Sequence, residues 1–177
     1  MFAKSNFEHN MRFDPDGFVL GQDTHPTSAM FYGLFPMGYN GCEVISVYNA
    51  MRLLGKPMPL SQVVRDFERG LHPLLFGVFG TKPSRIGRFL KKKGFDVTKK
   101  YRLDRLSQLS HDGAVFIISF WTSQKLICTI HTIAVRRVGE DRWEAYNLYN
   151  NTRAVKIKKI LADIIDDGRF ICGYYVK

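Results

Sequence analysis

Cysteine is scarce in this sequence, and long apolar runs are absent. The three cysteines, Cys42, Cys128 and Cys172, are odd in number and widely spaced, which argues against a disulfide framework and against a CxxC-type zinc site. No 18 apolar residues run together, and the segment from Met1 to His9 has no continuous apolar stretch typical of a signal peptide. We therefore expect a protein of a reducing compartment, the cytoplasm, without a transmembrane segment.

Acidic residues are also few, with 16 Asp and Glu against 26 Lys and Arg, which gives a net charge of +10. Such an excess either attracts nucleic acid, anionic membranes or acidic peptides, or forms a solvated basic surface. The cations are scattered over amphipathic segments, for example Lys91 to Lys93 at a helix end, and no aromatic residues interleave with them as in a base-stacking surface. We favour the solvated surface and do not expect a nucleic-acid partner.

Three motifs that would bind cofactors or metals are missing. The sequence has no phosphate-binding glycine loop, no zinc-ligand cluster and no carboxylate pair at helical spacing. An enzyme of this sequence would work with no metal and no cofactor. No feature points to a particular oligomeric state.

The chain reads as one domain over residues 1–177, because 45% hydrophobic residues suffice for a core and no Ser-, Gly- or Pro-rich linker interrupts it. Residues 1–38 hold many turn formers and predict irregular structure. Apolar spacing then predicts a helix from Cys42 that stops at Gly55, a second from Pro59 to Gly70, and a third from Pro83 to Gly94.

After Gly94 the sequence consists mainly of short apolar runs that are typical of β-strands. Two short helices are expected near residues 104–109 and 160–166. The predicted strands cover residues 95–101, 114–121, 126–138, 143–149, 154–157 and 170–176. Helices followed by an antiparallel sheet define an α+β fold.

Cys42 follows Asn40-Gly41 at the predicted start of the first long helix. Unpaired N–H groups and the positive end of the helix dipole favour a thiolate there, whereas Glu43 opposes ionisation unless it only caps the helix. A lone cysteine is otherwise most often a buried structural residue. The position therefore suggests a reactive thiol.

His131 and Asn147 are the expected partners of that thiol. A turn centred near residue 139 would place them opposite each other on adjacent antiparallel strands, so that the asparagine orients the imidazole. His131 also suits a satisfied core histidine, and His72 is the second choice of base. Phe31, Tyr32, Phe35, Phe76 and Phe79 either line a cleft or belong to the core.

The Asn-Gly-Cys-Glu-Val segment at residues 40–44, the helix ending at Gly55, the His131 strand and Asn147 together resemble papain-like cysteine peptidases. The nearest branch is that of the bacteriocin-leader-processing, double-glycine peptidases, and the likeness covers roughly residues 30–150. It implies a papain-like fold in which the nucleophile helix packs on the C-terminal sheet. The glutamine that such enzymes commonly carry six residues before the cysteine is replaced by Pro36, and the aspartate typical of this branch by Asn147.

The resemblance implies a hydrolase that cleaves a peptide or other amide through a thioester. Cys42 would be the nucleophile, His131 the base and Asn147 the orienting residue. The Cys42 N–H would bind the oxyanion, with Asn40 or Gln22 as second donor. An acyltransferase on the same three residues, or a catalytically silent papain-like binding domain with a basic surface, are the alternatives.

Overall fold

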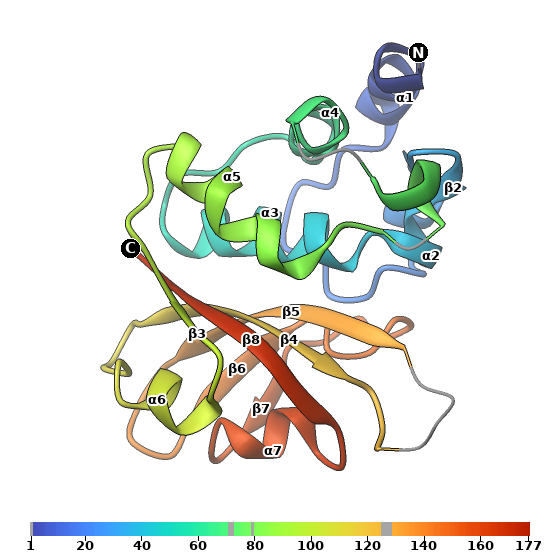
Figure 1. Cartoon of the computed structure of the whole chain (residues 1–177). Helices are drawn as coiled ribbons and strands as arrows, with labels where there is room; N and C mark the ends of the chain where they lie inside the picture. Colours follow the sequence, from blue (N-terminus) through green and yellow to red (C-terminus); the bar gives the residue numbers. More distant parts are fainter. Residues whose placement is uncertain (1, 71–72, 79, 125–128) are drawn as a thin grey trace.

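The computed structural model describes residues 2–70, 73–78, 80–124 and 129–177. Two layers form the molecule: helices from the first half of the chain lie over an antiparallel sheet from the second half (Figure 1). Within the described residues, no helix has the length and apolar character needed to cross a membrane. The α+β order predicted from the sequence is confirmed.

The helical layer is built around α3 (Cys42–Leu53), α4 (Leu60–Gly70) and α5 (Ile86–Lys92), which match the three predicted helices closely. Pro83 starts the third one as a 3-10 turn, as its fixed φ allows. The remaining elements of this half are short: η1 (Met11–Phe13), η2 (Thr27–Ala29), β1 (Phe31–Tyr32), β2 (Phe35–Pro36), α2 (Met37–Asn40), η3 (Leu74–Gly77) and η4 (Pro83–Arg85).

The main sheet has the strand order β3-β8-β4-β5-β6-β7, and every neighbouring pair is antiparallel. Each predicted strand has a counterpart, although the first residues of the strand predicted over 126–138 lie partly outside the described residues. The short helices α6 (Leu103–Ser107) and α7 (Ala162–Ile165) lie on the face away from α3 (Figure 1). The strands are β3 (Val97–Lys100), β4 (Val115–Trp121), β5 (Ile130–Arg137), β6 (Trp143–Tyr146), β7 (Lys156–Lys158) and β8 (Arg169–Val176).

The sheet carries an apolar core on each face. Alternate residues of β4 belong to the two different cores. Ile117 packs with the helices, whereas Phe116 and Ile118 pack with Trp143 and α6 on the other face. Strands buried on both faces read as continuous apolar runs, which is the pattern of residues 115–121. The sheet is therefore a rigid central layer to which both halves of the chain are fixed.

The first nine described residues correct the prediction of irregular structure over residues 1–38, because Phe2–Asn10 forms α1. Its apolar pattern is weak, so the periodicity gave no helix signal. Tertiary hydrogen bonds hold it instead: Asn6 Nδ2 donates to the Gly33 carbonyl at 2.8 Å and to Glu68 Oε1 at 2.6 Å, and Asn10 Nδ2 donates to the Phe31 carbonyl at 2.8 Å. Tertiary context here overrides local propensity.

Helix α3 is buried on every side, since each residue from Cys42 to Met51 is buried. The sequence suggested one apolar face, but a helix in the centre of a layer loses its solvent-facing side. Three polar residues, Glu43, Ser46 and Asn49, are enclosed with it. Buried polar groups need partners, and these three find theirs on other segments of the chain.

We expect Gly87→Ala to destabilise the protein even though alanine is the better helix former. A Cβ at Gly87 in α5 would lie 2.6 Å from the Tyr174 ring, and Tyr174 is a fully buried core residue. Forcing the ring aside should cost about 1–3 kcal/mol of unfolding free energy, measured by denaturant titration. Gly70→Ala at the end of α4 is the control, because an added Cβ there meets nothing within 4 Å; equal losses in both variants would contradict the steric explanation.

Candidate active site

Cys42 is the first residue of α3, and the short helix α2 runs directly into it through Gly41. A Cβ on Gly41 would lie 2.1 Å from Met37 Sδ, so only glycine fits this junction. One turn further on, Ser46 Oγ lies 2.6 Å from the Cys42 carbonyl and 2.6 Å from the Thr132 carbonyl. Ser46 therefore fixes the start of α3 against strand β5.

The Cys42 thiol is buried, with 7% of its surface exposed, and donates a hydrogen bond to Glu43 Oε2 at 3.3 Å. Burial raises the pKa of the Cys42 thiol well above its ordinary value, and the Glu43 carboxylate raises it further. The backbone N–H of Thr132 acts in the opposite direction and lowers that pKa. Burial and Glu43 thus oppose the thiolate expected at the helix start and favour the neutral thiol.

Glu43 is the immediate partner of the thiol and is itself buried. Burial raises the pKa of the Glu43 carboxyl to about 7, although its own backbone N–H and that of Thr81 favour the charged form. A Cβ at Gly80 would lie 3.1 Å from Glu43 Oε2, so the chain passes close over the carboxyl group. Close to neutral pH, this group changes its charge beside the sulfur.

The imidazole of His131 is held by a backbone carbonyl. His131 Nε2 lies 2.6 Å from the Asn147 oxygen. Because a carbonyl only accepts, Nε2 carries the proton of this hydrogen bond, and Nδ1 is the unprotonated nitrogen of the neutral ring. Burial lowers the pKa of His131, which favours the neutral form. The ring therefore presents one basic nitrogen, Nδ1.

Asn147 lies near His131, but not as its cross-strand partner. The ladder between β5 and β6 ends at the pair Ala134 and Tyr146, which centres the turn at residue 140 instead of 139. Continued by one residue, this register would place Asn147 opposite Ile133. Asn147 instead leaves the strand with a φ of 62°, a left-handed conformation that asparagine tolerates. The orienting group is its backbone carbonyl, which corrects the expected side-chain contact.

The side chain of Asn147 bonds to the amino-terminal segment. Its Oδ1 accepts from the Gln22 N–H at 2.9 Å, and its Nδ2 donates to Gln22 Oε1 at 3.3 Å. Gln22 Nε2 donates in turn to the Gly38 carbonyl at 2.5 Å. The fold thus brings Gln22 next to Asn147, whose carbonyl bonds to His131. The service of Gln22 as an oxyanion donor stays a prediction.

Asn40 is poorly placed for that service. Its Nδ2 donates to the Tyr32 carbonyl at 2.8 Å and to the Gly77 carbonyl at 2.7 Å, which occupies both N–H groups. Its Oδ1 is buried with no hydrogen-bond partner. Asn40 ties the β1–β2 hairpin to the 74–77 segment with both of its N–H groups, and its service as an oxyanion donor stays a prediction.

The Cys42 thiol lies at the Thr132 backbone of β5, the strand that carries His131, and no hydrogen bond among the described residues joins the two side chains. His131 lies on the side of Phe120, whose ring centroid is 6.0 Å away, and Thr132 on the α3 side. The thiol is next to the Thr132 N–H, one residue from the imidazole. Among the hydrogen bonds of the described residues, that of the thiol goes to Glu43 and none joins it to His131.

Several other sequence predictions concern residues around this site. His72, Cys128 and Phe79 lie outside the described residues. Tyr32 is fully buried, and its hydroxyl bonds to the Thr81 hydroxyl. Sequence reasoning missed Ser46 and Thr81; a serine four residues after the cysteine, inside an apolar helix, was the available signal for the first. Within the described part of the chain, no three His, Cys, Asp or Glu side chains gather into a possible metal site.

An exposed apolar surface lies near the start of helix α3. It consists of Leu34, Tyr39, Leu75 and Phe76, each more than 60% exposed. Asn40 connects the segments that carry them, because it bonds to the carbonyls of Tyr32 and Gly77. Four large apolar side chains in water at one place are typical of a binding surface.

Neither protein-family models nor curated protein sequences match this chain. A solved structure does: the peptidase domain of Streptococcus ComA, a bi-functional ABC transporter involved in a quorum-sensing pathway, superposes with a TM-score of 0.54. The match covers 82% of this chain and 95% of that domain at 12% sequence identity. The fold of this chain is therefore similar to that of this peptidase domain.

We expect Glu43→Gln to make the Cys42 thiol more acidic, because it removes the carboxylate that opposes thiolate formation. Iodoacetamide labelling of the Cys42 site, followed by peptide mass spectrometry against pH, should show its midpoint at lower pH and a several-fold faster rate above pH 7. The two profiles should converge well below pH 7, where Glu43 is protonated in the parent protein.

Glu8→Gln on exposed α1 is the matched control and should leave the profile unchanged. Cys42→Ala identifies the labelling contributed by other cysteines. An unchanged Cys42 profile in Glu43→Gln would show that the carboxyl does not govern the thiol.

Proposed function

We propose that this protein is a cysteine hydrolase that cleaves amide bonds through a thioester, with Cys42 as nucleophile and His131 as base. The observation that carries the proposal is the bond of 2.6 Å between His131 Nε2 and the Asn147 carbonyl, which leaves Nδ1 as the basic nitrogen. The Cys42 thiol at the start of α3 lies next to the N–H of Thr132, the residue that follows His131 in β5. Similarity of fold to a peptidase domain agrees with this assignment.

The proposed reaction requires the thiol to leave Glu43 and to come within reach of His131 Nδ1, which is a rearrangement of both side chains about strand β5. Nδ1 takes the thiol proton while sulfur attacks the amide carbonyl carbon. The imidazolium then gives that proton to the leaving amine as the C–N bond breaks, and a thioester remains on Cys42. Water, deprotonated by His131, attacks the thioester and releases the acid and the free thiol.

Oxyanion stabilisation would come from the start of α3. The first N–H groups of a helix have no partner within it, and Cys42 contributes the first of them. Gln22 is the proposed second donor, because its side-chain amide is already bound at Asn147 and Gly38. A side chain held at both ends loses little entropy when it binds the transition state.

A peptide is the proposed substrate class. The exposed apolar surface of Leu34, Tyr39, Leu75 and Phe76 is joined through Asn40 to the segment that ends at Cys42. A small amide would leave this surface in water, whereas a peptide with bulky apolar side chains would cover it. The surface therefore favours a peptide over a small amide.

A catalytically silent binding domain is the second candidate. The bond from the Cys42 thiol to Glu43 and the raised pKa of that thiol favour it, because an un-ionised thiol is a poor nucleophile. The two candidates differ in whether His131 accelerates reactions of Cys42.

We expect p-nitrophenyl acetate to acylate Cys42, with nitrophenolate release followed by absorbance and the thioester located by mass spectrometry. Cys42→Ala should abolish this acylation, and His131→Ala should slow it by about 10²–10⁴-fold, the usual contribution of a general base. Exposed His25→Ala is the matched control. Equal acylation rates in His131→Ala and the parent protein, at unchanged thermal stability, would favour the silent domain.

The variant Asn147→Gly distinguishes the contribution of the Asn147 backbone carbonyl from that of its side chain, because it keeps the first and removes the second. Glycine accepts a φ of 62° and keeps the carbonyl that holds His131, so acylation should fall less than about tenfold. Loss of the bonds to Gln22 should lower the unfolding free energy by about 1–3 kcal/mol. A loss of acylation as large as that of His131→Ala, in a variant that remains folded, would show that the side chain orients the imidazole.

A further inference from the structure

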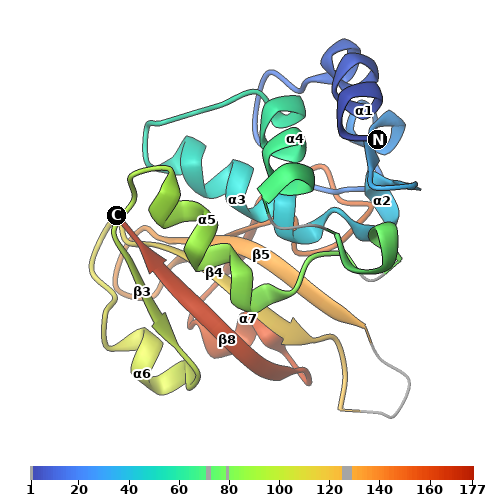
Figure 2. The same ribbon diagram turned by 45° about the horizontal axis from the view of Figure 1, so that its top comes forward.

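A basic groove is lined by residues of α5, β3 and β8. Figure 2 shows α5 beside the β3–β8 edge of the sheet, and the strand order places β4 between this edge and β5 of the candidate active site. Its volume is about 560 Å³, within the size range of pockets that hold small ligands. One helix face lines it from Ser84 to Lys92, at positions 84, 87, 88, 91 and 92. Val97, Lys99 and Tyr174 line it from the sheet.

Four cations face this groove: Arg88, Lys91, Lys92 and Lys99. No acidic residue is among its lining residues. Within the described residues, none of these four cations forms an ion pair. The sequence alone did not reveal the cluster, because Lys99 belongs to a different element and is brought opposite α5 only by the fold.

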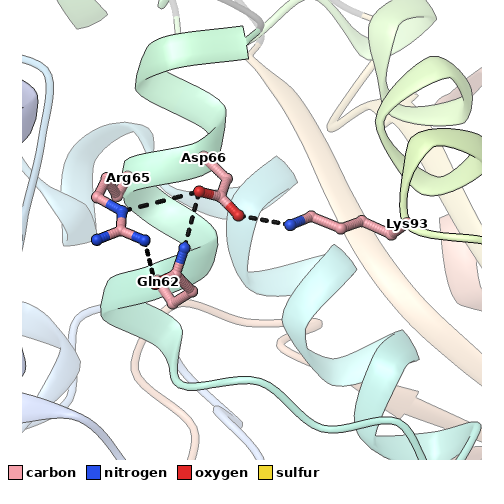
Figure 3. Close-up of polar contacts among 4 residues, drawn as sticks. All are labelled: Gln62, Arg65, Asp66 and Lys93. Carbon is pink, nitrogen blue, oxygen red and sulfur yellow. Dashed lines mark hydrogen bonds and ion pairs between the residues drawn. The ribbon is translucent and has the colours of Figure 1, made fainter.

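The acidic residues near the groove form ion pairs with lysines outside it. Lys93, the next residue of the same lysine run, turns toward α4 and binds Asp66 Oδ2 at 2.5 Å, where Asp66 also contacts Arg65 and Gln62 (Figure 3). Asp96, just before β3, is paired with Lys177 at 3.2 Å. The acids next to the groove are thus used elsewhere, and the charge inside it stays uncompensated.

Structural reasons do not account for the cluster. Arg88 is the third residue of α5, near the positive end of the helix dipole, where a cation is unfavourable. Its spacing to Lys91 and Lys92 places like charges three and four residues apart, which costs a few tenths of a kcal/mol for each pair. The helix dipole explains Lys91 and Lys92 in the last turn, but not Arg88.

Lys99, the cation on the sheet side of the groove, lies against two aromatic rings. Lys99 Nζ lies 4.4 Å from the Tyr101 ring centroid and 5.4 Å from that of Tyr174. Tyr174 is fixed in turn, because its hydroxyl donates to the Pro83 carbonyl at 2.9 Å. Aromatic rings orient an ammonium group without neutralising it, so Lys99 keeps a full charge directed by a rigid support.

From these observations we propose that the groove binds a ligand with at least two phosphate groups. Arg88 offers the planar fork that suits a phosphate, and the lysines supply further donors. Arg88 and Lys92 are about 6 Å apart along the helix axis, which separates two anionic groups without crowding them. The ligand is either a free nucleotide or the backbone of a short single strand, and these sources share the recognised chemistry.

Calorimetric titration of the full chain with ATP, inorganic pyrophosphate and a short oligothymidylate tests the proposal. An oligoglutamate of similar charge is included as a carboxylate probe. The groove variant Arg88→Gln/Lys99→Gln should lose about tenfold or more in affinity for the phosphate ligands and show a shallower dependence on salt. The matched control, Lys156→Gln/Lys158→Gln on β7 at the opposite edge of the sheet, removes the same charge and should change affinity less than about twofold.

The ligands distinguish the possible sources. Binding of ATP and pyrophosphate with similar affinity would identify a nucleotide or small polyphosphate, and much tighter binding of the oligonucleotide would identify a nucleic-acid backbone. Equal losses in the groove and control variants, oligoglutamate binding as tight as that of ATP, or no binding of any phosphate probe near physiological salt would each overturn the proposal. Unchanged melting temperatures of both variants confirm that the fold is intact.

Discussion

The burial of α3 on every side is the constraint on which this structure depends. A helix without a solvent face must satisfy each of its polar side chains internally, and the three on α3 do so with other segments. Ser46 bonds the Thr132 carbonyl of β5, and Asn49 bonds both backbone groups of Val19 at 2.8 and 3.0 Å. Glu43 binds the Thr81 backbone and the Cys42 thiol. One helix therefore sets the positions of the sheet, the amino-terminal segment and the loop before α5.

The same burial sets the chemistry of Cys42. In a low-dielectric interior the charged form of any group is disfavoured, so thiol, carboxyl and imidazole are all shifted toward their neutral forms. The Cys42 thiol bonds to Glu43, whereas the proposed acyl transfer requires His131 to take the thiol proton. As pH falls below about 7, Glu43 becomes neutral and no longer repels a thiolate.

Periodicity predicted most of the fold, because the long helices and the strands each follow one regular apolar pattern. The failures concern features that tertiary contacts decide. Helix α1 depends on bonds to Gly33 and Glu68 far along the chain, and the position of Asn147 depends on a turn centred one residue later than the sequence suggested. The ionisation of Cys42 could not be predicted either, since the helix terminus was visible in sequence but the enclosure of the thiol was not. The proximity of Asn147 to His131 was predictable from the sequence, but the atom of Asn147 that bonds to the imidazole was not.

The amino-terminal segment contributes residues that contact the candidate site directly. Gln22 holds the Asn147 side chain, and the Asp23 N–H donates to the Asn150 carbonyl at 2.8 Å, so residues 22–23 fasten the chain that follows β6. The side-chain bonds of Asn147 to Gln22 help to hold its backbone at the left-handed φ of 62°. Its carbonyl can hold His131 only while that conformation lasts. The orientation of the base therefore depends on residues more than a hundred positions away, through two hydrogen-bonded steps and no direct contact.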